Sequence, residues 1–212
     1  MRVRRMKNLE SRRARVAGYL IEPPQSGGLD FGQVFGNKNA VHMELGCGKG
    51  GFICALSQQC PDINFIGVER VPEVLVMAME KAQQAGRENV RYLCCDVRAL
   101  AEMVAPGSVG RIYLNFSDPW PKDRHAKRRL TAAPFLELYA QILAPGGQLH
   151  LKTDNRNLFE YSLRELENRG ASISDVCYDL HASGCPGNVM TEYERKFVEM
   201  GLPIHRLVAT FA

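Results

Sequence analysis

The sequence lacks the features that mark secreted, membrane-spanning and redox-active proteins. None of its apolar runs approaches the roughly 18 residues that a membrane-spanning helix needs. Residues 1–15 are basic and hold no apolar stretch, so they do not resemble a secretory signal. The seven cysteines include no Cys-x-x-Cys pair, which argues against a redox motif or a zinc knuckle. These absences predict a cytoplasmic protein without a membrane anchor.

Most of the cysteines are expected to be buried, reduced thiols that behave as small hydrophobic residues. Those that lie inside apolar segments are Cys54, Cys94, Cys95 and Cys177. His181 lies midway between Cys177 and Cys185, but these three side chains are fewer than the four ligands that a structural zinc site usually has. We therefore expect no bound metal.

Neither sign of charge dominates, but the positive charges are unevenly placed. The 212 residues carry a formal net charge of +4, with 45% hydrophobic residues, as in an ordinary globular domain. Basic residues crowd into one segment near the start and another in mid-chain. The first group is Arg2, Arg4, Arg5, Lys7, Arg12, Arg13 and Arg15, and the second is Lys122, Arg124, His125, Lys127, Arg128 and Arg129. Such clusters favour an anionic partner such as a nucleic acid, although a solvated surface accommodates them equally well.

Apolar runs of strand length alternate with helical patterns after a basic N-terminal arm, residues 1–30, that can be flexible. Strands are expected at 40–45, 63–69, 90–95, 111–116 and 148–153, and helices at 52–59, 73–85, 99–104, 133–143 and 157–169. Thr131 is a suitable cap for the helix at 133, and the last strands, 172–180 and 204–211, can pair as an antiparallel edge. The alternation predicts one α/β domain, residues 31–212, with a Rossmann-like, doubly wound, mostly parallel sheet and an antiparallel edge strand.

A glycine-rich turn follows the first expected strand. Residues 44–51 read Glu-Leu-Gly-Cys-Gly-Lys-Gly-Gly and open a helix, so that backbone N–H groups can approach a bound ligand closely. Glu69 ends the second strand, where a carboxylate can accept both hydroxyls of a ribose. Turn and carboxylate together indicate a nucleoside cofactor. No G-x-x-x-x-G-K-[ST] sequence is present, which excludes a P-loop.

The choice of cofactor depends on the residues around this turn, because its glycines also satisfy the dinucleotide pattern G-x-G-x-x-G. Glu44 precedes the first glycine by two positions, where a carboxylate suits an amino-acid ammonium group better than a pyrophosphate. Asp96 follows the third strand, where it can hold an adenine amino group. The chain is also short for a dehydrogenase, which usually adds a second half. We predict S-adenosylmethionine, bound by Glu44, Gly46, Gly48, Gly50, Glu69 and Asp96. A dinucleotide, or a turn without any ligand, is the alternative.

A second motif, Asn-Phe-Ser-Asp-Pro-Trp-Pro-Lys at 115–122, follows the fourth expected strand. It lies at the carboxyl end of the sheet, where open α/β folds bind their ligands. Pro119 and Pro121 stiffen the loop, and Trp120, the only tryptophan, is either a packing anchor or a surface for a base. Asp118 is either a functional carboxylate or a turn residue before a proline.

Taken together, these motifs resemble the bacterial tRNA (guanine-N7-)-methyltransferase family. The resemblance rests on the glycine turn, on Asp-Pro-Trp-Pro-Lys with the following His-x-Lys-Arg-Arg, on Thr153-Asp154 and on Thr-Glu-Tyr-Glu at 191–194. It runs from about residue 40 to the end of the chain, in the expected order. It implies a class I methyltransferase fold and transfer of a methyl group from S-adenosylmethionine to guanine N7 in the variable loop of tRNA.

The resemblance also implies roles for individual residues. Asp118 is implied to contact the cofactor and to be the catalytic residue. Residues implied to handle the guanine or the adjoining RNA are Lys122, Asp154, Thr191, Glu192, Tyr193 and Glu194. Those that would contact the RNA backbone are His125, Lys127, Arg128 and Arg129. Some have simpler explanations, because Thr191 and Glu194 also form a capping box and Asp154 can cap the helix that follows.

The chemistry of guanine N7 requires little of an enzyme beyond alignment. The N7 lone pair is free, so no proton has to leave before it attacks the methyl group of a sulfonium. A carboxylate such as Asp118 can stabilise the positive charge that develops on guanine. We expect no essential general base, no catalytic cysteine and no obligate protein partner. The alternatives are a methyltransferase for another RNA or a small molecule, and an inactive RNA-binding protein.

Overall fold

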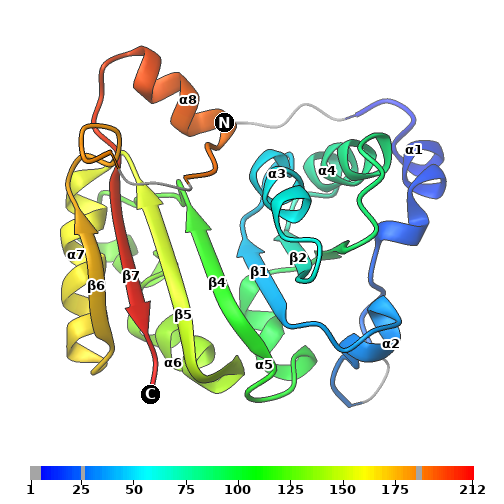
Figure 1. The fold of residues 1–212 in the computed structure, drawn as a ribbon, viewed down its shortest axis with the longest axis horizontal. Coiled ribbons are helices and arrows are strands. Elements are labelled where there is room, and N and C mark those ends of the chain that lie inside the picture. The colour runs from blue at the N-terminus through cyan, green and yellow to red at the C-terminus, as the bar shows by residue number, and fades with distance from the viewer. Residues whose placement is uncertain (1–5, 25–26, 185–187) are drawn as a thin grey trace. The chain divides into compact units, whose positions relative to one another are not determined.

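The computed structural model describes residues 6–24, 27–184 and 188–212 and consists of two compact units, Met1–Ala105 and Pro106–Ala212. Each unit has its own strands and helices (Figure 1) and contributes buried hydrophobic residues. Among the described residues, no helix has the length and apolar character that crossing a membrane requires. The predicted boundary between arm and domain at residue 30 stays a prediction.

Where the structure describes it, the first unit forms three parallel strands in the order β3-β2-β1. They are β1 (Val41–Leu45), β2 (Asn64–Glu69) and β3 (Val90–Cys94), all close to their predicted bounds. Helix α3 (Gly51–Gln59) joins the first two strands, and α4 (Pro72–Gln84) joins the second to the third. The middle strand is buried at every position but its last, which explains why it reads as a continuous apolar run.

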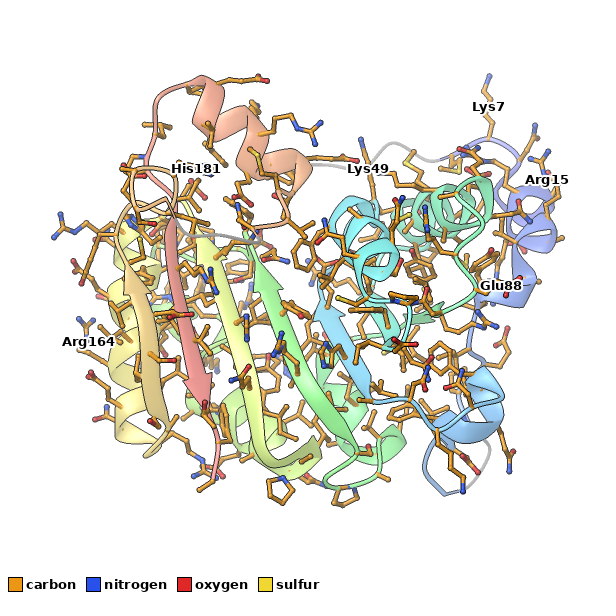
Figure 2. All side chains as sticks on the ribbon, viewed as in Figure 1. Lys7, Arg15, Lys49, Glu88, Arg164 and His181 are labelled. Carbon is orange, nitrogen blue, oxygen red and sulfur yellow. The ribbon has the colours of Figure 1, made fainter. Side chains whose placement is uncertain are left out.

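The described part of the N-terminal arm is folded against this unit. Helix α1 (Leu9–Arg15) is held by an ion pair between Arg12 and Glu80 of α4, and the Ile21 N–H donates to the Tyr92 carbonyl of β3 at 2.8 Å. A short helix, α2, follows at Phe31–Phe35. The side chains of Lys7 and Arg15 extend outward (Figure 2), whereas Arg2, Arg4 and Arg5 lie outside the described residues.

The first unit ends in a short helical segment where one longer helix was predicted at 99–104. A 3₁₀ turn (Val97–Ala99) leads into α5 (Leu100–Met103), so the helix is confined to a single turn. Cys94 is exposed, contrary to the expectation of a buried thiol. The reason is its place as the last residue of β3, where the buried part of the strand has ended.

The described residues of the second unit form four strands in the order β4-β5-β7-β6. They are β4 (Val109–Asn115), β5 (Leu143–Thr153), β6 (Ser172–Cys177) and β7 (His205–Thr210). The first two are parallel, and β7 runs antiparallel to both β5 and β6, which confirms the predicted antiparallel edge.

Helices α6 (Ala133–Ile142) and α7 (Arg156–Asn168) cover one face of these strands (Figure 1). The prediction that Thr131 caps α6 is wrong, because the helix begins after Ala132 and has Pro134 in its first turn. Thr131 is buried instead, and its hydroxyl lies 2.7 Å from the hydroxyl of Ser162 in α7. A buried hydroxyl needs such a partner, so Thr131 joins the two helices.

Candidate functional site

The glycine-rich turn between β1 and α3 has a backbone that favours glycine. Gly46, Gly48 and Gly50 have φ angles of 76°, 55° and 69°, in the left-handed region that residues with a Cβ rarely adopt. A Cβ on Gly50 would lie 2.8 Å from that of Ala78, so this glycine also lets the turn approach α4. In the described part of the chain, nothing lies within 4 Å of a Cβ placed on Gly46 or Gly48. The turn is therefore supported on one side and open on the other.

Two carboxylates surround this turn. Glu69, at the end of β2, accepts hydrogen bonds from the N–H groups of Gly48 at 3.2 Å and Val71 at 3.0 Å. Glu44 lies in β1 and is only 4% exposed. Burial, and then the negative charges of Glu44 and Glu69, raise the pKa of the Cys47 thiol well above its usual value. Cys47 therefore stays a neutral thiol. The negative charges of Glu44 and Glu69 also make the turn a favourable place for a positively charged group.

Asp96 completes a row of carboxylates at the ends of three neighbouring strands. The register pairs Glu44 with Gly67 and Glu69 with Cys94, so the carboxyl ends of β1, β2 and β3 meet at one edge. Asp96 follows β3 and is exposed, and one of its oxygens accepts the Arg98 N–H at 3.0 Å. The structure thus brings together, within the first unit, the residues that were predicted to hold a nucleoside cofactor.

The loop after β4 has a strained backbone. Phe116 and Trp120 have φ angles of 53° and 42°, and a residue other than glycine in this region costs roughly 1–2 kcal/mol. Strain of this kind persists where the surrounding structure holds it, often at functional sites. Arg129 donates hydrogen bonds to the carbonyls of Pro119 at 3.0 Å and Trp120 at 3.1 Å. Asp118 is exposed in this loop.

The mid-chain basic cluster folds as a 3₁₀ turn, Asp123–Arg128, which the sequence did not predict. The Arg128 guanidinium lies 4.9 Å from the centre of the Trp120 ring. The His125 ring packs edge-on against the same Trp120 ring, with 5.8 Å between the ring centres. Arg128 is nonetheless exposed, as are Lys122, Arg124 and Lys127. Arg128 therefore contacts the Trp120 ring while it remains accessible to solvent. Arg124 was not among the predicted site residues.

The segment Thr191–Glu194 begins helix α8 (Glu192–Glu199) with a capping box, which confirms one of its two predicted roles. The Glu194 N–H donates to the Thr191 hydroxyl at 2.8 Å, and the Thr191 N–H donates to the Glu194 carboxylate at 3.3 Å. Glu194 is fully buried and forms an ion pair with Lys152 of β5 at 2.7 Å. Asn188 at 2.5 Å and His181 at 3.1 Å complete the contacts of this carboxylate.

The charge of Glu194 is maintained by these partners. Burial alone would raise the pKa of Glu194, but the charge of Lys152 and the hydrogen bonds from Lys152, Asn188 and Thr191 outweigh it. The pKa therefore lies below its usual value. This pair could not be predicted, because Lys152 and Glu194 are 42 positions apart and Lys152 reads as an ordinary strand residue. His181, considered above as a metal ligand, contacts Glu194, and Cys185 lies outside the described residues.

An aromatic stack joins α8 to the loop after β4. The Phe116 ring stacks on Tyr193 at 6.5 Å and on Phe197 at 6.0 Å. Helix α8 therefore lies at the carboxyl ends of β4 and β5, as Figure 1 shows. Tyr193 is 59% exposed, and its neighbour Glu192 is also exposed.

Asp154 directly follows β5, and helix capping does not account for it. The cap of α7 is Asn155, whose side chain accepts the Leu158 N–H at 2.8 Å. The alternative that Asp154 caps the helix is therefore wrong. Asp154 lies two residues after Lys152, at the same strand end as the Glu194 network.

Comparisons with known proteins agree with these motifs. The model of a family described as "Putative methyltransferase" matches residues 38–207. A relative from Streptococcus thermophilus, named tRNA (guanine-N(7)-)-methyltransferase, is 50% identical over 211 residues, which cover 100% of this chain and 99% of the relative. Relatives with the same name are 47% identical in Lachnoclostridium phytofermentans, covering 97% of each chain, and 50% identical in Bacillus subtilis, covering 82% of this chain and 81% of the relative.

Solved structures show the fold at lower identity. The 16S rRNA methyltransferase KamB is 15% identical, with a TM-score of 0.64, and the match covers 89% of this chain and 95% of KamB. A SAM dependent methyltransferase from Aquifex aeolicus is also 15% identical, with a TM-score of 0.58 and 82% of each chain covered. The fold is the class I methyltransferase fold, a Rossmann-like, mostly parallel sheet with an antiparallel edge strand, which confirms the prediction.

Proposed function

The chain belongs to the tRNA (guanine-N(7)-)-methyltransferase family, and on that premise we propose that it methylates N7 of a guanine in tRNA. The observation that carries the proposal is the 50% identity, along the whole chain, with a relative named for this reaction. We further propose the variable loop as the target. N7 faces the deep major groove of an A-form helix, so a guanine in a loop is more accessible. The cytoplasmic location stays a prediction that suits a tRNA substrate.

We propose S-adenosylmethionine as the cofactor, because the residues at the glycine turn fit its parts. Glu44 suits the ammonium group, Glu69 the ribose hydroxyls and Asp96 the adenine amino group. The open side of the turn at Gly46 and Gly48 leaves space for a ligand to approach the backbone. When bound, the cofactor supplies a methyl group on a positively charged sulfur. The negative charges of Glu44 and Glu69 at the turn favour a ligand with a positive charge.

The proposed mechanism depends on positioning. Guanine N7 would form its bond to the methyl carbon as the methyl–sulfur bond breaks, and S-adenosylhomocysteine would leave. Because N7 carries no proton, no side chain has to remove one, and alignment of the reacting atoms is the main catalytic term. We assign to Asp118 the stabilisation of the positive charge that develops on guanine. This carboxylate is exposed, on a loop whose backbone is held by Arg129.

We propose that Asp154, rather than Glu194, contacts the guanine edge. An ionised carboxylate offers about four acceptor positions. Those of Glu194 are filled by its own chain, since Oε2 accepts from Lys152 and Thr191, while Oε1 accepts from Asn188 and lies 3.1 Å from His181 Nε2. Glu194 therefore holds the start of α8, and exposed Tyr193 and Glu192 are the members of this segment that can meet RNA.

The exposed basic residues Lys122, Arg124 and Lys127 are proposed to contact tRNA phosphates, together with Lys7 and Arg15 of the N-terminal segment. Phosphate contacts of this kind orient the RNA without reading its sequence. The Arg128 guanidinium contacts the Trp120 ring and so places a positive charge beside the loop of Asp118, and the His125 ring contacts Trp120 edge-on.

Transfer of labelled methyl groups to purified RNAs tests the proposal. The protein is incubated with labelled S-adenosylmethionine and either tRNA from a strain that lacks the modification, ribosomal RNA or free guanosine. We expect label in tRNA alone. Label in ribosomal RNA or guanosine would favour a different methyltransferase, and tRNA binding without any transfer would favour the inactive RNA-binding protein.

A further inference from the structure

Arg129 ends the basic cluster, yet its guanidinium faces its own chain. Nε donates to the Pro119 carbonyl at 3.0 Å, Nη2 donates to the Trp120 carbonyl at 3.1 Å, and the group lies 4.3 Å from the centre of the Tyr161 ring. The residue is only partly exposed, whereas its neighbours Lys127 and Arg128 are exposed. Two donors and one face of this guanidinium are thus engaged within the second unit.

The two carbonyls belong to the peptide groups on either side of the Trp120 Cα. The orientation of the Pro119 carbonyl depends on φ of Trp120, and that of the Trp120 carbonyl depends on ψ of the same residue. A planar guanidinium that binds both therefore restrains both dihedral angles. This restraint matters because Trp120 has a φ of 42°, which a residue with a large side chain keeps only when its surroundings hold it.

We propose that Arg129 is a positioning residue, which holds Trp120 in its left-handed conformation, and with it the Asp118–Lys122 segment, and which does not contact RNA phosphates. This assignment replaces the RNA-backbone role that the sequence suggested for Arg129. The proposal rests on the proposed function for its catalytic consequence, because Asp118 and Lys122 flank the restrained residues. The Arg129 guanidinium also packs on the ring of Tyr161 in α7, so it connects the loop to that helix.

The test uses Trp120, the only tryptophan, as a reporter of the loop. Arg129→Lys keeps the charge but loses the fork that binds two carbonyls. We expect the Trp120 emission of this variant to move to longer wavelength and to be quenched more strongly by acrylamide. We expect kcat for tRNA methylation to fall about ten- to a hundredfold, because a misplaced loop loses alignment, while KM for tRNA stays unchanged.

Arg129→Gln tests the alternative of a phosphate contact. Loss of a phosphate contact lowers the slope of log affinity against log salt by about one. We expect the slope of log tRNA affinity against log salt to be the same for Arg129→Gln as for the protein without substitutions. Lys127→Gln is the matched control, because Lys127 is exposed in the same cluster. It is expected to lower the slope and to leave the Trp120 emission unchanged.

Unchanged Trp120 emission in Arg129→Lys, or a lowered salt slope in Arg129→Gln, would overturn the proposal. Circular dichroism and thermal unfolding establish that each variant is folded. If Arg129→Gln does not fold, the emission and kcat of Arg129→Lys decide. If the unmodified protein transfers no methyl group to tRNA, the proposed function fails, whereas the emission comparison still decides whether Arg129 holds the loop.

Discussion

Glu194 is fully buried, yet its pKa lies below its usual value. Removal of a carboxylate from water normally favours its neutral form, but the charge of Lys152 and the hydrogen bonds from Lys152, Asn188 and Thr191 offset that cost. The carboxylate in return fixes the residue that caps α8 and the strand end that carries Lys152. A single side chain thus joins the start of α8 to β5.

Replacement of Lys152 by methionine should destabilise the protein strongly. Removal of one partner of a buried ion pair leaves an uncompensated charge, which costs about 3–5 kcal/mol. Unfolding in urea measures this loss in Lys152→Met. In the double variant Lys152→Met/Glu194→Gln, part of the stability should return, because the isolated charge is gone. A loss below about 1 kcal/mol in the single variant would show that the pair is not the main support of α8.

The same pair should make stability depend on pH in the acid range. The folded-state pKa of Glu194 is depressed, so its contribution is fully present above the unfolded value of about 4.3 and is lost as the pH falls through the lower folded value. We expect Glu194→Gln to flatten the dependence of the free energy of unfolding on pH below about 4.3. Parallel acid curves for the two proteins would contradict this account.

Replacement of Asp118 by asparagine should lower kcat by about a hundredfold, the size typical of losing one charge-stabilising group. The side chain is exposed, so the thermal unfolding midpoint should not change. Single-turnover methyl transfer measures the chemical step separately from tRNA binding. Near-normal single-turnover rates would remove Asp118 from the mechanism.

At the scale of elements, the first unit was predicted well and the connections of the second less well. The apolar run of β1 ends before Gly46 and that of β2 ends at Glu69 and Arg70, which makes the carboxyl ends of these strands readable. The turn Asp123–Arg128 has no hydrophobic periodicity, so it read only as a basic cluster. The role of Thr131 and the Lys152–Glu194 pair could not be predicted for the same reason. Each depends on a partner that lies far along the chain.

Alanine substitutions in the glycine turn should have different effects at Gly50, which packs against α4, and at Gly48, which faces open space. Gly50→Ala brings a Cβ to 2.8 Å from Ala78 and strains a left-handed backbone, so it should reduce the free energy of unfolding by more than 2 kcal/mol, about twice the cost of the strain alone. Gly48→Ala meets only open space, so only the backbone strain of about 1 kcal/mol applies. Its larger effect should be on S-adenosylmethionine affinity, measured by calorimetry. Equal stabilities of the two variants would contradict this description of the turn.

At the scale of the whole molecule, the net charge of +4 is too small to indicate a nucleic-acid partner, whereas the clustering of the basic residues is compatible with one. The exposed basic residues of the mid-chain cluster lie in the same unit as Asp118, whereas Arg15 of the N-terminal segment lies on α1 and Lys7 precedes that helix. The sequence motifs were sufficient to predict the family. The separation of the basic cluster into a loop-holding part and an exposed part required the structure.

The chemical identity of the methylated base tests the central claim most directly. Unmodified tRNA is incubated with the protein and S-adenosylmethionine, and is then treated with borohydride and aniline, which cleave RNA at N7-methylguanine. We predict a single new cut, within the variable loop, that is absent without cofactor. Methyl incorporation without any cut would contradict the assignment of N7.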